Sequence, residues 1–93
     1  MVGKDKKESR AAIIRNKLGL HARSAAQIAE IAGNSEANVW IVKGGQKADA
    51  SSIMDILTLE CAQGTKITIV IEDGADTGIL EAIFNLVDSG FGE

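Results

Sequence analysis

Hydrophobic and polar positions follow different periods along this chain, and each period predicts a type of element. Residues 65–71 place isoleucine at every second position towards their end, which is typical of a strand with one buried face. Residues 22–32 repeat alanine and isoleucine at steps of three and four, the period of an amphipathic helix. Residues 75–89 show the same period and predict a second long helix.

Shorter segments complete the predicted order β-α-β-β-α-β-α. Gly44-Gly45 separates two extended runs and suits a two-residue hairpin turn. Trp40 lies among apolar neighbours in the first run, so alternation does not decide whether it faces the core or the open side. The order predicts an α+β open-faced sandwich, with a four-stranded, mainly antiparallel sheet and three helices on one face. Strands are expected at residues 11–16, 37–43, 46–50 and 65–71.

A short helix is expected to end near Leu59. Ser51 or Ser52 is its natural N-cap, because a serine hydroxyl accepts a hydrogen bond from a free amide of the first turn. Asp55 stands three residues after Ser52 and predicts a variant of the capping box. Five apolar residues crowd this helix, which is too many for one buried stripe, so we expect some of them to face solvent.

Composition narrows the class of function. The chain has 93 residues, 45% hydrophobic and 25% charged, which suits one globular domain. We assign residues 10–93 to that domain and residues 1–9 to a flexible charged tail. A net charge of −3 and a shortage of aromatic residues argue against nucleic-acid binding.

The sequence also shows no feature of secretion or of metal binding. No apolar run reaches membrane-spanning length and no signal-peptide core is present, so we expect a cytoplasmic protein without membrane insertion. Cys61 is the single cysteine, which excludes an internal disulfide. One histidine and one cysteine 40 positions apart do not make a zinc site, and we expect neither a metal nor a cofactor.

His21, the single histidine, stands directly before the helical pattern that begins at Ala22. The first amides of a helix lack partners within it and carry the positive end of its dipole, which favours a bound phosphate and a neutral imidazole. A phosphoryl group on a nucleophilic ring nitrogen would meet the amides of Ala22 and Arg23. The Arg23 guanidinium would bind its oxygens. The segment therefore predicts a covalent phosphoryl-carrier site.

A less specific interpretation of His21 stays open on these residues alone. A histidine at a helix start is commonly a partly exposed residue without chemistry. Other chemistries have less support, since the chain shows no Ser-His-Asp arrangement, no paired carboxylates for hydrolysis and no glycine-rich phosphate loop.

Two segments and the C-terminus resemble a known family. Gly19-Leu20-His21-Ala22-Arg23, followed by Ala25, resembles the active-site signature of HPr, the histidine-containing phosphocarrier of the bacterial phosphoenolpyruvate-dependent phosphotransferase system. Ser52-Ile53-Met54, with Leu57 and Leu59, resembles the second-helix segment of that family, and Gly90-Phe91-Gly92-Glu93 is similar to endings found there. The resemblance runs from about Ala11 to the C-terminus. Ser24 departs from it, because relatives typically carry proline at that position.

The resemblance implies that His21 accepts a phosphoryl group, as a pros-phosphohistidine, and that Arg23 and the backbone of Ala22 and Arg23 stabilise it. It implies transfer from enzyme I, charged by phosphoenolpyruvate, to IIA-type domains, in sugar uptake or in a regulatory phosphotransferase branch. Such a carrier is not itself an enzyme, and it is most simply a monomer. The side chains expected to contact its partners are Leu20, Ser24, Ile53, Met54 and Leu57.

The resemblance also makes Ser52 a candidate regulatory site, because the matching serine in many relatives is phosphorylated by a regulatory kinase of the HPr kinase/phosphorylase type. Asp55 opposes this role, since a carboxylate in the first turn would repel a phosphate. Two other functions stay open. One is a regulatory binding module controlled by Ser52 phosphorylation without carrier turnover, and the other is a small enzyme such as an acyl-phosphate hydrolase.

Overall fold

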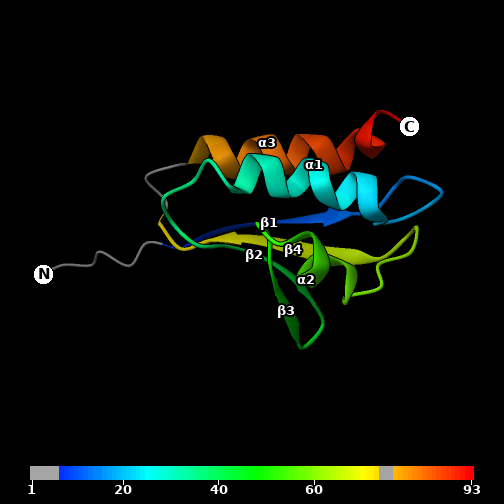
Figure 1. Ribbon diagram of the computed structural model, residues 1–93, viewed down its shortest axis with the longest axis horizontal. Coiled ribbons are helices and arrows are strands. Elements are labelled where there is room, and N and C mark those ends of the chain that lie inside the picture. Colours follow the sequence, from blue (N-terminus) through cyan, green and yellow to red (C-terminus); the bar gives the residue numbers. More distant parts are fainter. Residues whose placement is uncertain (1–6, 74–76) are drawn as a thin grey trace, which may run out of the picture.

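The computed structural model describes residues 7–73 and 77–93 (Figure 1). Its sheet has the strand order β1-β4-β2-β3, and every pair of neighbours is antiparallel. The strands are β1 (Glu8–Ile13), β2 (Val39–Lys43), β3 (Gln46–Asp49) and β4 (Lys66–Ile71). The helices are α1 (Ala22–Ala32), α2 (Ile53–Leu57) and α3 (Thr77–Asp88), followed by the 3-10 turn η2 (Gly90–Gly92).

The helices form a single layer over one face of the sheet. Helices α1 and α3 lie side by side, α3 packs on β1 and β4, and α2 packs beside α1 (Figure 1). The arrangement confirms the α+β open-faced sandwich. It also brings η2, at the end of the chain, next to the first turn of α1 (Figure 1).

The core lies between the sheet and the helices. The alternating isoleucines of β4, Ile67, Ile69 and Ile71, are at most 1% exposed, as the period-two pattern predicts. They meet Ile28 of α1 and Ile83 of α3 in the same buried cluster, both fully buried. Each such isoleucine contributes roughly 1.5–3 kcal/mol of hydrophobic stabilisation relative to an exposed side chain.

Trp40, whose direction the pattern left undecided, lies half-buried on the open face of the sheet. Its neighbour Ile41 takes the core-facing position in β2. The indole Nε1 of Trp40 donates to Glu72 Oε2 at 2.8 Å, and Lys47 lies over the ring, 4.1 Å from its centroid. The indole is therefore stabilised by polar partners on the open face of the sheet rather than by full burial.

Most predicted boundaries were wrong by one to three residues; β2 begins at Val39 rather than at residue 37, β3 ends at Asp49 rather than at residue 50, and β4 begins at Lys66 rather than at residue 65. Strand β1 begins at Glu8 rather than at residue 11, because the ladder to β4 extends as far as the Glu8–Ile71 pair, so residues 8 and 9 belong to the sheet and not to a tail. The strand also ends at Ile13, before Asn16. Helix α2 ends at Leu57, two residues early. Residues 1–6 of the predicted tail (1–9) and the expected helix start at residue 75 lie outside the described residues.

Ser52 is the N-cap of α2, as predicted, and its hydroxyl accepts from the Asp55 amide at 3.2 Å. The second half of the expected capping box was wrong. The Asp55 carboxylate accepts from the Asp49 amide at 2.7 Å instead of returning to the amide of Ser52, which bonds to the Asp49 carbonyl. Asp55 therefore ties α2 to the end of β3.

Candidate functional site

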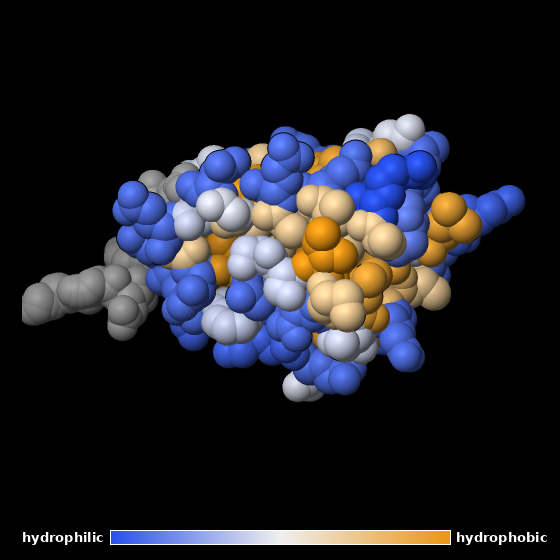
Figure 2. Space-filling model, in the orientation of Figure 1, coloured by the Kyte–Doolittle hydropathy of each residue, from blue (hydrophilic) through white to orange (hydrophobic). Residues whose placement is uncertain are grey.

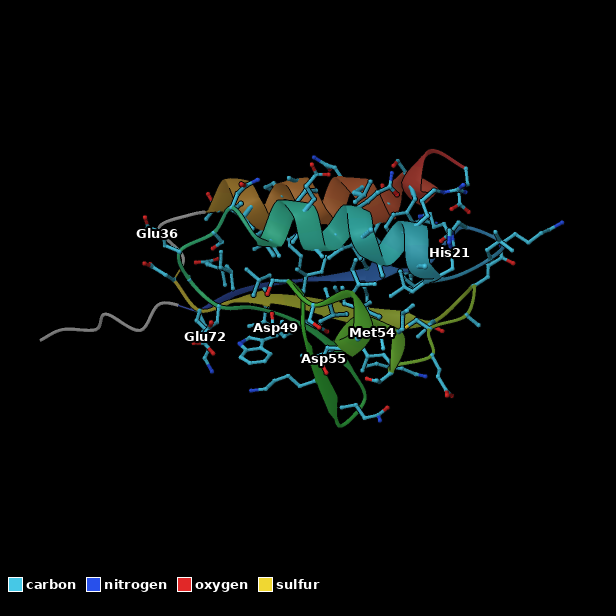
Figure 3. The ribbon with its side chains drawn as sticks, in the orientation of Figure 1. His21, Glu36, Asp49, Met54, Asp55 and Glu72 are labelled. Carbon is cyan, nitrogen blue, oxygen red and sulfur yellow. The ribbon has the colours of Figure 1, made fainter. Side chains whose placement is uncertain are left out.

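His21 is the N-cap of α1, at the junction between a loop and the helix (Figure 3). Its backbone is extended, with φ −124° and ψ −178°, and its side chain is 26% exposed. The preceding residue, Leu20, is buried, and its amide donates to the Cys61 carbonyl at 2.8 Å. The loop is thus fixed to the core on one side of His21, and the imidazole is left at the surface.

Gly19 allows the loop to approach the core this closely. Its φ is +69°, and a Cβ at this position would lie 2.4 Å from the Cys61 carbonyl oxygen, well inside van der Waals contact. Any other residue would have to move the segment of Cys61 and Ala62 or the loop itself. Gly19 therefore allows the loop that carries His21 to pack directly against Cys61 and Ala62.

Ser24 supports the backbone of His21 from inside the first turn. It is fully buried, and its hydroxyl accepts from the His21 amide at 2.9 Å. The same oxygen lies 3.3 Å from the Gly19 carbonyl and 3.2 Å from the His21 carbonyl, to either of which it can donate. The hydroxyl therefore satisfies the amide of the N-cap residue and leaves the amides of Ala22 and Arg23 free.

Arg23 and its neighbour Ala22 lie where the sequence analysis expected anion-binding groups. Both lie in the first turn of α1, where amides have no acceptor within the helix. The Arg23 side chain is 70% exposed, and one of its guanidinium nitrogens lies 3.4 Å from Glu93 Oε2. The guanidinium is therefore close to the imidazole and loosely held.

Glu93 is a residue of the site that the sequence analysis missed. Its Oε2 lies 2.6 Å from His21 Nε2, although 72 positions separate the two residues. The turn η2 carries Glu93 there, and Phe91, which is only 6% exposed, anchors that turn in the core. The closing tetrapeptide is the sequence signal that could have pointed to this contact, but it gives no direction for the carboxylate.

Asn16 holds the second oxygen of the same carboxylate. Its Nδ2 donates to Glu93 Oε1 at 3.2 Å and to the Gly19 carbonyl at 2.7 Å. The side chain is 5% exposed, and its Oδ1 is buried without a hydrogen-bond partner. A buried acceptor without a hydrogen bond costs about 1–3 kcal/mol of stability, so the oxygen of Asn16 destabilises the fold at this position.

These contacts define the charge on Glu93. The hydrogen bond from His21, and then that from Asn16, hold the pKa of the Glu93 carboxyl below its ordinary value. An ionised carboxylate only accepts hydrogen bonds, so the nitrogen that faces it, Nε2 of His21, is the one that carries a proton. In the neutral imidazole the lone pair is then on Nδ1.

Comparison with known proteins shows which family this chain belongs to. The model of the family described as PTS HPr component phosphorylation site matches residues 8–89. The chain belongs to the HPr family. It is 41% identical to the phosphocarrier protein NPr of Shewanella violacea, over 94% of this chain and 96% of that protein. It is 35% identical to the phosphocarrier protein HPr of Cupriavidus necator, over 84% and 88%.

The fold agrees with a solved member of the same family. The crystal structure of HPr-C-His from Thermoanaerobacter tengcongensis matches with a TM-score of 0.86 at 34% identity, covering 92% of this chain and 97% of that one. The protein is thus an HPr/NPr-type phosphocarrier of the phosphotransferase system. The relatives are similar over almost their whole lengths, so the resemblance drawn from the two motifs is confirmed.

An apolar patch lies on α2, the helix that packs beside α1. We define it as Ile53, Met54 and Leu57 of α2; Met54 is 76% exposed and Ile53 38%, while Leu57 is half-buried. Figure 2 shows hydrophobic colour gathered over α2 and the adjoining part of α1, bordered by hydrophilic residues. Figure 3 shows Met54 on α2, and His21 at the start of the neighbouring α1.

Two of the five expected partner-binding side chains are not at this surface. Leu20 and Ser24 are only 8% and 0% exposed, because both are used to fix the loop under His21. Leu18, which the sequence analysis did not select, is 67% exposed on the same loop. Contact with a partner protein would therefore involve Leu18 more directly than Leu20 or Ser24.

Within residues 7–73 and 77–93, no group of three or more His, Cys, Asp and Glu side chains is placed to hold a metal ion. Across the same residues, no helix is long and apolar enough to cross a membrane.

Proposed function

We propose that this HPr-family protein carries its phosphoryl group on Nδ1 of His21, the pros nitrogen. It would take the group from an enzyme-I-type donor, charged by phosphoenolpyruvate, and give it to an IIA-type acceptor. The observation that carries the proposal is the place of His21 at the N-cap of α1, with Nε2 occupied by Glu93 and the first-turn amides and Arg23 next to the ring.

The transfer needs little chemistry beyond positioning. The Nδ1 lone pair forms a bond to phosphorus while the bond from phosphorus to the donor breaks, and the electron pair of that bond leaves with the donor. Charge on the phosphoryl oxygens is stabilised by the amides of Ala22 and Arg23. The exposed Arg23 guanidinium lies next to Glu93. A rotation of its side chain brings it to those oxygens, two of which it binds at once.

Glu93 acts on the other side of the ring. Because Nε2 keeps its proton against the carboxylate, the imidazole becomes positively charged as Nδ1 bonds phosphorus, and Glu93 stabilises that charge. The same ion pair is present when the group leaves again. The arrangement therefore assists transfer in both directions, which a carrier requires.

The patch of Ile53, Met54 and Leu57 gives donor and acceptor a common place to dock. Its exposed apolar side chains lie on the helix that packs beside α1, so a partner seated there reaches His21. Methionine adapts to different partner surfaces. A small patch gives weak, short-lived contacts, in keeping with a monomeric cytoplasmic carrier that releases each partner.

The decisive experiment supplies labelled phosphoenolpyruvate and enzyme I. We expect one acid-labile phosphoryl group per chain, absent in His21→Ala, with 15N NMR placing phosphorus on Nδ1. Arg23→Ala should slow uptake by roughly ten- to a hundredfold. Arg15→Ala is the matched control, because Arg15 is an exposed arginine that pairs with Asp88 rather than with Glu93, and its uptake should stay normal. A wild-type chain that takes no label from this donor would refute the proposal.

The alternative regulatory module depends on Ser52. The Ser52 hydroxyl accepts from the Asp55 amide, and the carboxylates of Asp55 and Asp49 both lie at this corner of the fold. The pKa of the Asp49 carboxyl is held below its ordinary value by the hydroxyl and amide of Ser51, so it stays ionised. A phosphate on Ser52 would face both charges, which favours the carrier. Acid-stable label on Ser52 that needs ATP and a kinase would favour the module instead.

Whether the carrier feeds sugar uptake or a regulatory branch depends on its acceptor. We propose to separate the two with purified acceptors, by measuring how fast labelled protein passes the group to a transporter-associated IIA domain and to a free IIA-type protein. A sugar-uptake carrier should prefer the first, and a regulatory carrier the second. Hydrolysis of acetyl phosphate by the unlabelled protein would instead support the acyl-phosphate hydrolase.

A further inference from the structure

The described residues contain two buried polar side chains, Asn16 and Ser24, and both lie beneath His21. Each has a polar atom within hydrogen-bond distance of the Gly19 carbonyl, at 2.7 Å for Asn16 Nδ2 and 3.3 Å for Ser24 Oγ. Ser24 then continues to the main chain of His21 through its amide. Asn16 continues to the ring of His21 through Glu93. The Gly19 carbonyl is thus linked to the backbone of His21 through Ser24, and to its imidazole through Asn16 and Glu93.

We infer that Asn16 is a positioning residue that, through Glu93, fixes which imidazole nitrogen of His21 carries the proton and which one is open to phosphorus. The inference rests on the proposed function. Asn16 does not touch the reacting atoms; it touches Glu93 Oε1, while the other carboxylate oxygen of Glu93 meets Nε2.

The orientation of the Asn16 amide is fixed by its surroundings. Both groups that it faces, the Gly19 carbonyl and the Glu93 carboxylate, are acceptors, so its NH₂ must point to them and its oxygen must point away. That oxygen finds no donor in its buried environment. All of the hydrogen bonds of the Asn16 side chain are therefore made by its NH₂ group, as a donor.

Asn16 therefore gives the carboxylate a fixed second contact. Glu93 lies in the final turn of the chain, and Arg23, its other side-chain partner, is 70% exposed at a longer distance. Asn16 by contrast is buried, so its position is set by the core. Without Asn16, Glu93 would be free to leave Nε2, and the proton would be free to move to Nδ1, the nitrogen that must be bare for transfer.

The test is Asn16→Asp, which replaces the donating NH₂ group with an accepting oxygen at nearly constant volume. The 15N chemical shifts of the imidazole report the tautomer directly, at a pH where the ring is neutral and in the absence of any donor protein. We expect the wild type to be mainly Nε2–H and the variant to shift towards Nδ1–H. Uptake from enzyme I should slow by roughly ten- to a hundredfold because the reacting nitrogen is mispositioned.

The chain offers a matched control in a second Asn–Glu pair. Asn38 Nδ2 lies 3.5 Å from Glu72 Oε1 on the open side of the sheet, so Asn38→Asp makes the same change of charge away from His21. It should leave both the tautomer and the uptake rate unchanged. A general effect of the added charge would appear in both variants and would overturn the inference.

A second variant keeps the test decisive if Asn16→Asp does not fold. Asn16→Leu removes the donor without adding a charge, and it should give the same shift of tautomer. Glu93→Gln and the double variant with Asn16→Leu complete a cycle. If Asn16 acts through Glu93, the double variant loses no more in uptake rate than Glu93→Gln alone.

Two results would overturn the inference: a folded Asn16 variant with the wild-type tautomer, or losses that add fully in the double variant. Failure of the proposed function looks different. In that case the wild type takes no phosphoryl group on His21, whereas the tautomer of the unphosphorylated ring still responds, or fails to respond, to Asn16.

Discussion

Glu93 Oε2 lies 2.6 Å from Nε2 of His21, so the final residue of this sequence completes a site that begins 72 positions earlier. The contact exists because α3 runs antiparallel beside α1 and delivers the turn η2 to the first turn of that helix (Figure 1). The candidate site thus combines the first turn of α1 with a carboxylate that the end of α3 brings to the same ring.

Phe91 should control the position of Glu93. Its ring is buried although its φ is +60°, a strained conformation that packing must maintain. We expect Phe91→Ala to lower the free energy of unfolding by about 3 kcal/mol. It should also slow phosphoryl uptake, because the turn no longer holds the carboxylate. Urea titration and a label-transfer assay measure the two effects.

Phe84→Ala is the control for this prediction. Phe84 lies in the middle of α3. The Arg10 guanidinium lies over its ring, with the guanidinium carbon 3.8 Å from the ring centroid. The variant should lose about 2 kcal/mol of stability and keep its uptake rate. Equal loss of uptake in both variants would mean that general destabilisation, and not Glu93, is responsible.

Gly19→Ala should be far more damaging than the same change at another left-handed glycine. Both Gly19 and Gly44 have positive φ, but a Cβ at Gly44 meets nothing within 4 Å. We expect about 1 kcal/mol of destabilisation for Gly44→Ala from backbone strain, and about 3 kcal/mol or more for Gly19→Ala because of the added clash with Cys61. Thermal or urea unfolding separates them, and similar losses would contradict the close approach at Gly19.

Trp40 should report the ionisation of Glu72. The indole hydrogen bond, followed by that from Asn38, holds the pKa of the Glu72 carboxyl below its ordinary value. A carboxyl with a depressed pKa stabilises the fold above its ordinary pKa, and this contribution is lost as the pH falls through the folded value. Trp40 is the single tryptophan, so its fluorescence should change with a midpoint below that of an ordinary glutamate.

Glu72→Gln should abolish this acid transition in tryptophan fluorescence while the protein stays folded. A transition that persists in Glu72→Gln would have another origin, and one centred at the ordinary glutamate value would contradict the effect of the indole bond on the pKa.

Met54→Lys should weaken docking without changing the chemistry. The side chain is 76% exposed, so a lysine fits without strain, but it places a charge within the apolar patch. Loss of an apolar anchor of this kind costs about 1–2 kcal/mol, so we expect KM for enzyme I to rise about tenfold at nearly constant kcat. Ile13→Lys is the control, because Ile13 is exposed (38%) on β1, outside this patch. Equal effects of the two lysines would refute a specific docking role for Met54.

The sequence by itself determined most of the elements and the position of His21 at the start of a helix. Period-two isoleucines defined β4, and the alanine-rich helical period placed the start of α1 directly after His21. These are local signals, because burial of alternate positions and the free amides of a first turn need only a few neighbouring residues. The same is true of Ser52 as N-cap, and of Gly44-Gly45 as a hairpin.

The tertiary structure alone decided which distant groups meet at the imidazole. Nothing local distinguishes Asn16 from an ordinary turn residue, directs Glu93 to Nε2, or shows that Leu20 and Ser24 are buried rather than available to a partner. Each of these depends on the packing of α3 beside α1 and of the loop against Cys61. Hydrogen bonds between residues far apart in the chain are set by how the elements pack, and the pattern of a single segment carries no record of that packing.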